Sequence, residues 1–259
     1  MTGHSKTIRN KITIGVLGAA LGGLLPATAF AATPSGGATN TPSATAPTGT
    51  GSQSDPRCTP SDLPAAKSYV EGLLKDRVVR LERLTAQVGS ARAVTASDKV
   101  QLDSLLANEL TGIESLEQQV PGDNTCAELV AHAETMVLTY RVYAVMTPQT
   151  ELVVVSDTAN VIASSVVEWE PRIQAAIDYQ AAHGKDVAQA QQALDDLKTQ
   201  LTDALASLNG VSSTVLAQTP AGYPGNHAVF VSARNSCATG FGDLGRARAD
   251  LGTILSVLS

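Results

Sequence analysis

Aromatic residues and cysteine are scarce in this 259-residue chain, which has three Phe, one Trp, five Tyr and three Cys. Three cysteines are too few for a disulfide-dense miniature scaffold. The low aromatic content and a formal charge of −6 argue against a nucleic-acid binder. Hydrophobic residues nevertheless make up 43% of the chain, enough for a sizeable core, which excludes complete intrinsic disorder. Thirty-eight alanines favour helices that pack closely through small residues.

The N-terminal region has the layout of a secretory signal peptide. Residues 1–11 hold three basic and no acidic residues, and an apolar run broken by glycines extends from Ile12 to Phe30. The small residues Ala29 and Ala31 predict a signal peptide of residues 1–31 with cleavage after Ala31, and Ala29 is the second choice. The alternative is an uncleaved membrane anchor. Membrane contact is expected only in that case, because no other segment is interpreted as a membrane span.

Residues 32–57 consist mostly of Thr, Ser, Pro, Gly and Ala and are expected to form a disordered tether. Cleavage after Ala31 leaves 15 Lys and Arg against 24 Asp and Glu, so the mature chain is strongly acidic. One predicted helix departs from this balance, because it carries Arg77, Arg80 and Arg83. These arginines are interpreted either as partners of acidic neighbours or solvated groups, or as a contact surface for an anionic polymer or lipid.

From residue 58 onward, apolar residues three and four positions apart predict amphipathic helices. The pattern divides into six segments, at about 61–91, 95–120, 125–147, 152–183, 186–217 and 227–258. Because short connections between long helices place neighbours antiparallel, the sequence predicts an all-α fold. We expect an elongated antiparallel up-and-down bundle of about six helices with coiled-coil-like packing over residues 58–259. One six-helix bundle and two stacked sets of helices both remain open.

Local signals mark the ends of several of these segments. Thr125 with Glu128 has the spacing of a capping box, which predicts a helix start there. Pro171 lies inside the fourth segment and is expected to kink it, because proline has no amide hydrogen to donate. Gly210 marks a weak point in the fifth segment. The third segment is expected to stop before Pro148.

The three cysteines of an exported chain predict one disulfide and one unpaired thiol. Cys58 precedes the first predicted helix and Cys126 begins the third, so the two lie at the same end of an up-and-down pair. We therefore predict a disulfide between Cys58 and Cys126. Cys237 lies on the apolar stripe of the last segment and is interpreted as a buried hydrophobic residue.

The sequence contains no recognisable catalytic, cofactor-binding or metal-binding pattern. Glu128 and His132 have the spacing of a helical ligand pair, but no second pair accompanies them. Trp169 lies between Glu168 and Glu170, and it is interpreted as a core residue or, alternatively, as part of a ligand site. No phosphate-binding loop, nucleophile elbow or dinucleotide fingerprint is present. We therefore predict that the protein is not an enzyme and needs no cofactor.

Two short sequence motifs are similar to motifs of a known group of proteins. They are Tyr-Arg-Val-Tyr from Tyr140 to Tyr143 and Thr-Pro-Gln at residues 147–149. They resemble phrases in Ala-rich, secreted, all-helical proteins of unknown function from high-GC Gram-positive bacteria. The likeness extends over residues 61–259 and includes the Ala-Arg pairs at 233–234 and 247–248. It implies a secreted helical protein and brings no activity with it. Tyr140 and Tyr143 are interpreted as packing anchors or, alternatively, as a binding site.

The sequence as a whole predicts an exported, non-enzymatic helical bundle. Its expected role is that of a structural or protein-interaction module of the cell envelope or extracellular space, with an unidentified protein or envelope component as partner. The alternative is a ligand-binding or sensor-like bundle with a small-molecule or lipid site near Trp169 and Pro171. Both hypotheses place function in binding instead of catalysis.

Overall fold

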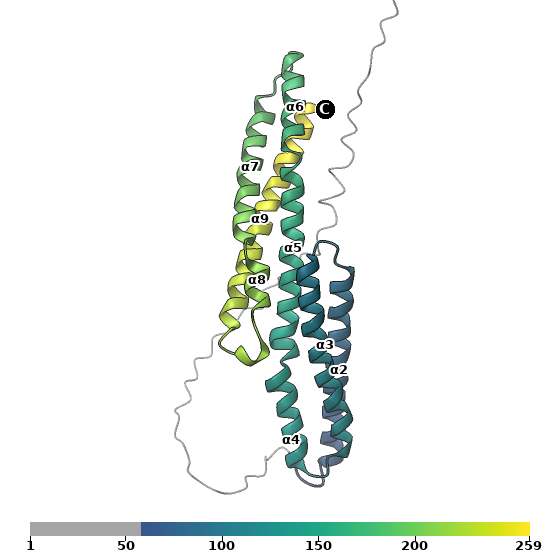
Figure 1. Ribbon diagram of the computed structural model, residues 1–259. Helices are drawn as coiled ribbons and strands as arrows, with labels where there is room; N and C mark the ends of the chain where they lie inside the picture. The colour runs from purple at the N-terminus through teal and green to yellow at the C-terminus, as the bar shows by residue number, and fades with distance from the viewer. Residues whose placement is uncertain (1–57) are drawn as a thin grey trace, which may run out of the picture. The chain divides into compact units, whose positions relative to one another are not determined.

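The computed structural model describes residues 58–259, and every regular element within them is helical (Figure 1). The predicted signal peptide 1–31, its cleavage at Ala29 or Ala31, and the tether 32–57 lie outside the described residues. The α-helices are α2 (Leu63–Ser90), α3 (Ala96–Gln119), α4 (Cys126–Glu134), α5 (Thr147–Val167), α6 (Glu170–Ala182), α7 (Ala188–Leu208), α8 (Val211–Leu216) and α9 (His227–Leu258). Two π-helical segments, η4 (Thr135–Tyr140) and η5 (Val142–Met146), join α4 to α5, while η3 (Val120–Gly122) and η6 (Pro220–Gly222) are single 3₁₀ turns.

The capping box that the sequence predicted at Thr125 is present, and a side-chain cap also forms at Thr95. Thr95 accepts a hydrogen bond from the backbone N–H of Asp98 at the start of α3. At the start of α4, Thr125 accepts from the backbone N–H of Glu128, whose carboxylate accepts from the N–H of Thr125 in return. Each bond satisfies an amide that the helix itself leaves without a partner, which fixes where the helix begins.

The expected stop before Pro148 is wrong. Helical segments follow one another from Cys126 to Ala182, interrupted only at Arg141 and at the turn of Glu168 and Trp169, and Figure 1 shows α4, α5 and α6 along one line. Pro148 lies in the first turn of α5, directly after the π segment η5, so the proline falls where the helix changes its hydrogen-bond pattern and does not end it. The third and fourth predicted segments are therefore successive parts of one long helical run and not neighbours that fold back on each other.

The kink expected at Pro171 and the weak point expected at Gly210 both coincide with the end of an α-helix. Helix α5 ends at Val167 and α6 begins at Glu170, so Pro171 again occupies a first turn. Gly210 separates α7 from α8 with a φ of 71°, a left-handed conformation that glycine adopts without steric cost. Both residues lie at the boundary between two successive helices, and the helical pattern resumes directly after each boundary.

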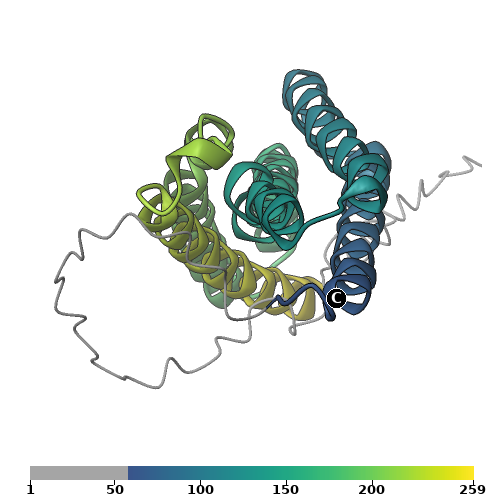
Figure 2. The same ribbon diagram turned by 90° about the horizontal axis from the view of Figure 1, so that it is seen from below.

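The helices pack on two sides of the long run, as the view along it shows (Figure 2). Helices α2 and α3 pack against each other, and α2 also contacts α5. Helix α7 packs along α9, and α5, α7 and α9 contact one another. The core is made of the predicted stripes, with fully buried leucines on α2, α3 and α7 and smaller residues such as Ala233 and Gly240 on α9.

Part of the long helical run from Cys126 to Ala182 is as apolar as a membrane-spanning helix. By length and composition, the helix from Cys126 to Ala182 could cross a bilayer, so the interpretation that no second segment has this property is wrong. Half of its most apolar window is buried inside the fold, against the neighbouring helices. Core helices pass the same test of length and composition, since both environments select apolar residues.

Gly240 brings α7 and α9 close together. A Cβ atom built on Gly240 would lie 2.8 Å from Cγ of Leu208, which is completely buried. On the same helix, a Cβ atom on Gly245 would contact nothing within 4 Å. The glycine at position 240 therefore allows a contact that alanine would prevent.

We expect Gly240→Ala to lower the free energy of unfolding by about 1–3 kcal/mol, because Leu208 must leave its rotamer or the helices must separate. Gly245→Ala is the matched control on α9. It should raise the free energy of unfolding by up to about 1 kcal/mol, since alanine is the better helix former. Urea unfolding followed by circular dichroism measures both, and equal effects of the two substitutions would contradict the close-contact explanation.

Candidate functional site

A cleft of about 310 Å³ lies between the start of α9 and the junction of η5 with α5. We call it the tyrosine cleft, because Tyr143 and Tyr223 both line it. Its remaining lining residues are Ala144, Thr147, Pro148, Glu151, His227, Phe230, Val231 and Arg234. Its size is at the lower end of the range in which proteins bind small ligands or single side chains of a partner.

Helical spacing explains why these residues share one cleft. His227, Phe230, Val231 and Arg234 lie three and four residues apart, which places them on one face of α9. Phe230 is buried at 4% exposure, whereas Val231 is 42% exposed. The cleft therefore has an apolar base with polar groups at its edges.

Two arginines of α2 lie against the opposite wall. The guanidinium carbon of Arg77 is 5.1 Å from the centroid of the Tyr143 ring. Arg80 donates from Nε to the hydroxyl of Thr147 at 3.1 Å and from Nη2 to Oε1 of Glu151 at 2.5 Å. Arg83 is exposed and makes no ion pair within residues 58–259. The structure thus brings Arg77 and Arg80 to Tyr143 and leaves Arg83 outside the site.

Burial makes the charge of Arg77 less favourable. Desolvation lowers the pKa of its guanidinium from the ordinary value, while the nearby Tyr143 and Asp76 oppose that shift. Its Nη1 donates to the backbone carbonyl of Leu73, but its buried Nε has no hydrogen-bond partner. A cation held in this way would gain from a nearby anion.

Arg141 has an unusual backbone conformation next to the cleft. It lies between the two π segments with φ 48° and ψ 40°, and it is the one non-glycine residue with positive φ among the described residues. Its guanidinium carbon lies 4.8 Å from the ring centroid of Tyr223, and its Nε is buried without a hydrogen-bond partner. π-helical turns and left-handed residues of this kind cluster at functional sites.

The left-handed backbone at Arg141 predicts an inverted preference between alanine and glycine. We expect Arg141→Gly to be more stable than Arg141→Ala by about 1 kcal/mol, because only glycine adopts this conformation without a Cβ clash. At Arg83, in the regular part of α2, the same pair should show alanine more stable by about 1 kcal/mol. Urea unfolding of the four variants measures both differences, and the same order at both positions would contradict the left-handed assignment.

Tyr140 packs on α3 instead of lining the cleft. A Cβ atom built on Gly112 would lie only 2.0 Å from Cε1 of Tyr140, so the glycine makes room for the ring. The interpretation of Tyr140 as a packing anchor therefore holds. Tyr143 differs, since it is 50% exposed and its role as a core anchor is wrong. The π segments alter the helical period between the two tyrosines and turn Tyr143 outward.

Glu109 lies one helical turn before Gly112 on the same face of α3. Burial raises the pKa of its carboxyl to about 8, and its Oε2 has no hydrogen-bond partner. At neutral pH, the folded protein therefore holds this carboxyl largely in the protonated form.

This shift gives stability a pH dependence with a definite sign. The ordinary pKa of Glu in an unfolded chain is about 4.3, so between about pH 4 and 8 the folded state binds this proton more tightly. We expect the free energy of unfolding to fall as the pH rises through this window and to level off above it. Glu109→Gln should make that fall smaller and be more stable than the parent at high pH, whereas the exposed control Glu114→Gln should leave the fall unchanged. The part that remains comes from Asp157 and Asp250, whose pKa values burial also raises. Urea titrations at several pH values test this, and an unchanged pH profile in Glu109→Gln would contradict the assignment.

Trp169 lies away from the tyrosine cleft. It is half-buried in the turn between α5 and α6, so its interpretation as a core residue is wrong. The break before Pro171 turns the ring out of the apolar stripe. The guanidinium carbon of Arg172 lies 4.7 Å from the Trp169 ring centroid.

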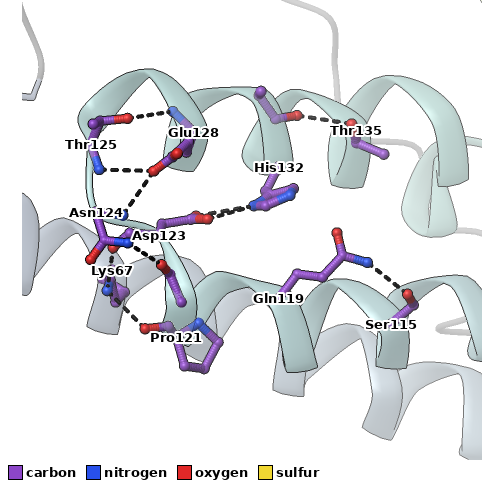
Figure 3. A network of polar contacts seen from close by, with 12 residues as sticks. Lys67, Ser115, Gln119, Pro121, Asp123, Asn124, Thr125, Glu128, His132 and Thr135 are labelled. Atoms are coloured by element: carbon purple, nitrogen blue, oxygen red, sulfur yellow. Dashed lines mark hydrogen bonds and ion pairs between the residues drawn. The ribbon is translucent and has the colours of Figure 1, made fainter.

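The predicted disulfide is present between Cys58 and Cys126, and Cys237 is buried and unpaired. A polar network surrounds the Cys126 end (Figure 3). The carboxylate of Asp123 pairs with Nδ1 of His132 at 3.0 Å, and Lys67 donates to the backbone carbonyl of Asp123 at 2.6 Å.

This network explains the side chains that resembled a metal-ligand pair. Glu128 accepts from the backbone N–H groups of Asn124 and Thr125, which lowers the pKa of its carboxyl. His132 is held by Asp123. No group of three or more His, Cys, Asp or Glu residues that could hold a metal ion occurs within residues 58–259. These residues instead hold the end of the α2–α3 pair against α4.

Sequence reasoning gave no functional role to most residues of the cleft, among them Tyr223, His227 and Arg234. Tyr223 belongs to a loop with no periodic pattern, and it lies more than 70 residues from Tyr143 along the chain. The sequence analysis placed His227 and Arg234 on a helix. The apolar spacing did not show which segment lies opposite the face of the helix that carries them. The 3–4 spacing of His227, Phe230, Val231 and Arg234 is the signal that was available.

The chain matches no protein-family model, no curated protein and no solved structure. The function proposed below therefore depends on the geometry of the described residues alone.

Proposed function

We propose that the chain is an exported, non-enzymatic helical protein that acts in the cell envelope or extracellular space by binding a partner. The observation that carries this proposal is the tyrosine cleft. It combines exposed Tyr143, an apolar base at Phe230 and a strained backbone at Arg141, features that belong together at a recognition site. The partner is a protein or another envelope component.

The chemistry of the cleft favours binding over catalysis. Glu151, its one carboxylate, is held by Arg80. His227 makes no hydrogen bond to another side chain in the described part of the chain, so it orients no nucleophile. A histidine that activates a side-chain nucleophile needs that nucleophile within hydrogen-bond reach. The Cys58–Cys126 disulfide supports export, because disulfides persist in oxidising compartments.

We also propose antiparallel, coiled-coil-like packing within each set of helices. The connection between α2 and α3 spans only residues 91–95, and that between α6 and α7 spans 183–187. Buried leucines such as Leu74, Leu81, Leu194 and Leu201 recur at helical spacing on the packed faces. Such rigid helical sets would hold the two walls of the cleft at a fixed separation.

The test uses position-specific cross-linking in an envelope fraction. A photoreactive residue at Tyr143 should capture a defined partner, whereas the same residue at Tyr179, which is 60% exposed on α6, should not. Capture at neither position, or equally at both, would overturn the cleft as the binding site. N-terminal sequencing of the exported chain tests export separately, and the expected first residue is Ala32.

The alternative function is a ligand-binding or sensor-like bundle with a small-molecule or lipid site near Trp169 and Pro171. The half-buried ring of Trp169 with Arg172 beside it favours this alternative, since such a pair could bind an aromatic or acidic group. Titration of the tryptophan fluorescence with envelope lipids tests it. A response that Arg172→Gln abolishes would support the alternative, and no response would exclude lipid binding at this position.

A further inference from the structure

The tyrosine cleft is surrounded by positive charge on a chain that is otherwise acidic. Arg77 and Arg141 lie against the two tyrosine rings, and Arg234 lines the cleft directly. The one acidic lining residue, Glu151, is neutralised by its ion pair with Arg80. The whole chain has a formal charge of −6, so this positive charge is local. Charge complementarity of this kind selects an anionic occupant.

The tyrosines themselves argue against a cationic ligand. Aromatic rings bind cations through the negative potential of their faces. Tyr143 and Tyr223 each already have a guanidinium group about 5 Å from the ring centroid. A second cation would be repelled by these arginines, and the negative faces of the two rings already interact with their guanidinium groups. The cleft therefore differs from an aromatic cage for ammonium groups.

The base of the cleft adds an apolar requirement. Phe230, Val231, Pro148 and Ala144 supply an apolar surface between the charged edges. Inorganic polyphosphate offers no apolar group for this surface, whereas a polypeptide can place an apolar side chain next to an acidic one. The lining face of η5 and α5 extends over Tyr143 to Glu151, or about 12 Å at 1.5 Å per residue. An extended segment of about four residues covers that length.

We infer that the tyrosine cleft binds a short acidic segment of a partner polypeptide, with its carboxylate on Arg234 and an adjacent apolar side chain against Phe230 and Val231. This inference rests on the proposed function and names the chemistry of the partner. Arg234 suits the role because its exposed guanidinium makes no ion pair or side-chain hydrogen bond in the described part of the chain. Arginine binds carboxylates with two parallel hydrogen bonds.

Fluorescence anisotropy with synthetic peptides tests the inference on the full mature chain. The probe peptide carries two acidic residues alternating with Leu and Phe between Gly-Ser flanks. In one comparison peptide, lysines replace the acids, and in a second, serines replace Leu and Phe. We expect the probe to bind at least about tenfold more tightly than either comparison peptide and to weaken as salt is raised.

Two variants on α9 identify the arginine. Arg234→Gln should weaken binding of the probe about tenfold, because it removes a charge-assisted pair. Arg248→Gln, which is also exposed and lies further along the same helix, should leave binding unchanged. Both residues are on the surface, so both variants are expected to fold, and circular dichroism verifies this.

Three outcomes would overturn the inference: equal binding of the acidic and lysine peptides, an unchanged affinity in Arg234→Gln, or displacement of the probe by inorganic polyphosphate at lower concentration than by unlabelled probe. The last result would assign the cleft to a phosphate polymer. Should Tyr143 cross-link a partner while the acidic peptide fails to bind, the proposed function stands and the acidic ligand class is wrong. Absence of the cross-link as well would remove both.

Discussion

Reduction of the Cys58–Cys126 disulfide is expected to lower the free energy of unfolding by about 4 kcal/mol. The bond joins residues 68 positions apart, so the loop that it closes contains all of α2 and α3. Without the bond, the unfolded chain gains the conformational freedom of that whole loop, whereas the folded state changes little. Urea unfolding with and without a reductant, followed by circular dichroism, gives the difference.

Two variants separate this effect from a general effect of the reductant. Cys237→Ala removes the buried unpaired thiol and should leave the loss on reduction unchanged. The double substitution Cys58→Ala and Cys126→Ala should lower stability without the reductant and show no further loss with it. A reductant effect that persists in the double variant would contradict the assigned pairing.

The loss of stability should also be local. Helices α2 and α3 pack mainly on each other and lie inside the closed loop, while α7 and α9 lie outside it. Reduction should therefore increase amide hydrogen exchange in α2 and α3 more than in α7 and α9. Equal increases throughout residues 58–259 would show that the described helices unfold as one unit.

The sequence predicted most of the helices because their signals are local. Apolar spacing places Leu194 and Leu201 in the core, and the capping box at Thr125 needs only residues within one turn. The pairing of Cys58 with Cys126 followed from the order of the helices alone. In each of these cases, the spacing of residues along the chain was enough to predict the contact.

The continuation of the helix through Pro148 and the strain at Arg141 were missed for the opposite reason. A proline in a first turn and a proline that stops a helix look alike in sequence, and the packing around α5 decides between them. Similarly, the unbroken apolar spacing through Tyr140 and Tyr143 gave no sign of a π segment. The left-handed residue between them is held by contacts such as that of Arg141 with Tyr223, which are distant along the chain.

The candidate site likewise combines residues that the sequence singled out with residues that only the fold brings together. Tyr143, Arg77 and Arg80 were named because their residue types stand out in an acidic, Ala-rich chain, but the sequence gave them no common location. The other wall of the cleft comes from α9 and the loop before it. Which face of α9 meets which part of α5 depends on how α7 and α8 connect them, and no local pattern encodes that.

Gln149 is expected to hold the two walls of the cleft in position, so its replacement should have the second large effect. Its side chain is completely buried and donates from Nε2 to the backbone carbonyls of Val215 and Gln218, both at 2.9 Å. Gln149→Met keeps the shape but removes both donors, which should lower the free energy of unfolding by about 2 kcal/mol. The loop that carries Tyr223 begins at Gln218, so the contact of Tyr223 with Arg141 should weaken too.

Gln149→Glu makes the reason for this loss measurable through pH. An ionised carboxylate at this position has no proton to donate, faces carbonyl oxygens and is buried, so at high pH the variant should be less stable than Gln149→Met. A protonated carboxyl can donate one hydrogen bond, so at low pH the order of the two variants should reverse. Burial raises the folded pKa of such a carboxyl above its unfolded value, and its contribution is therefore lost as the pH rises. Urea unfolding at acidic and alkaline pH measures both variants. The same order of stability at both would show that Gln149 acts through its volume and not through the hydrogen bonds that it donates.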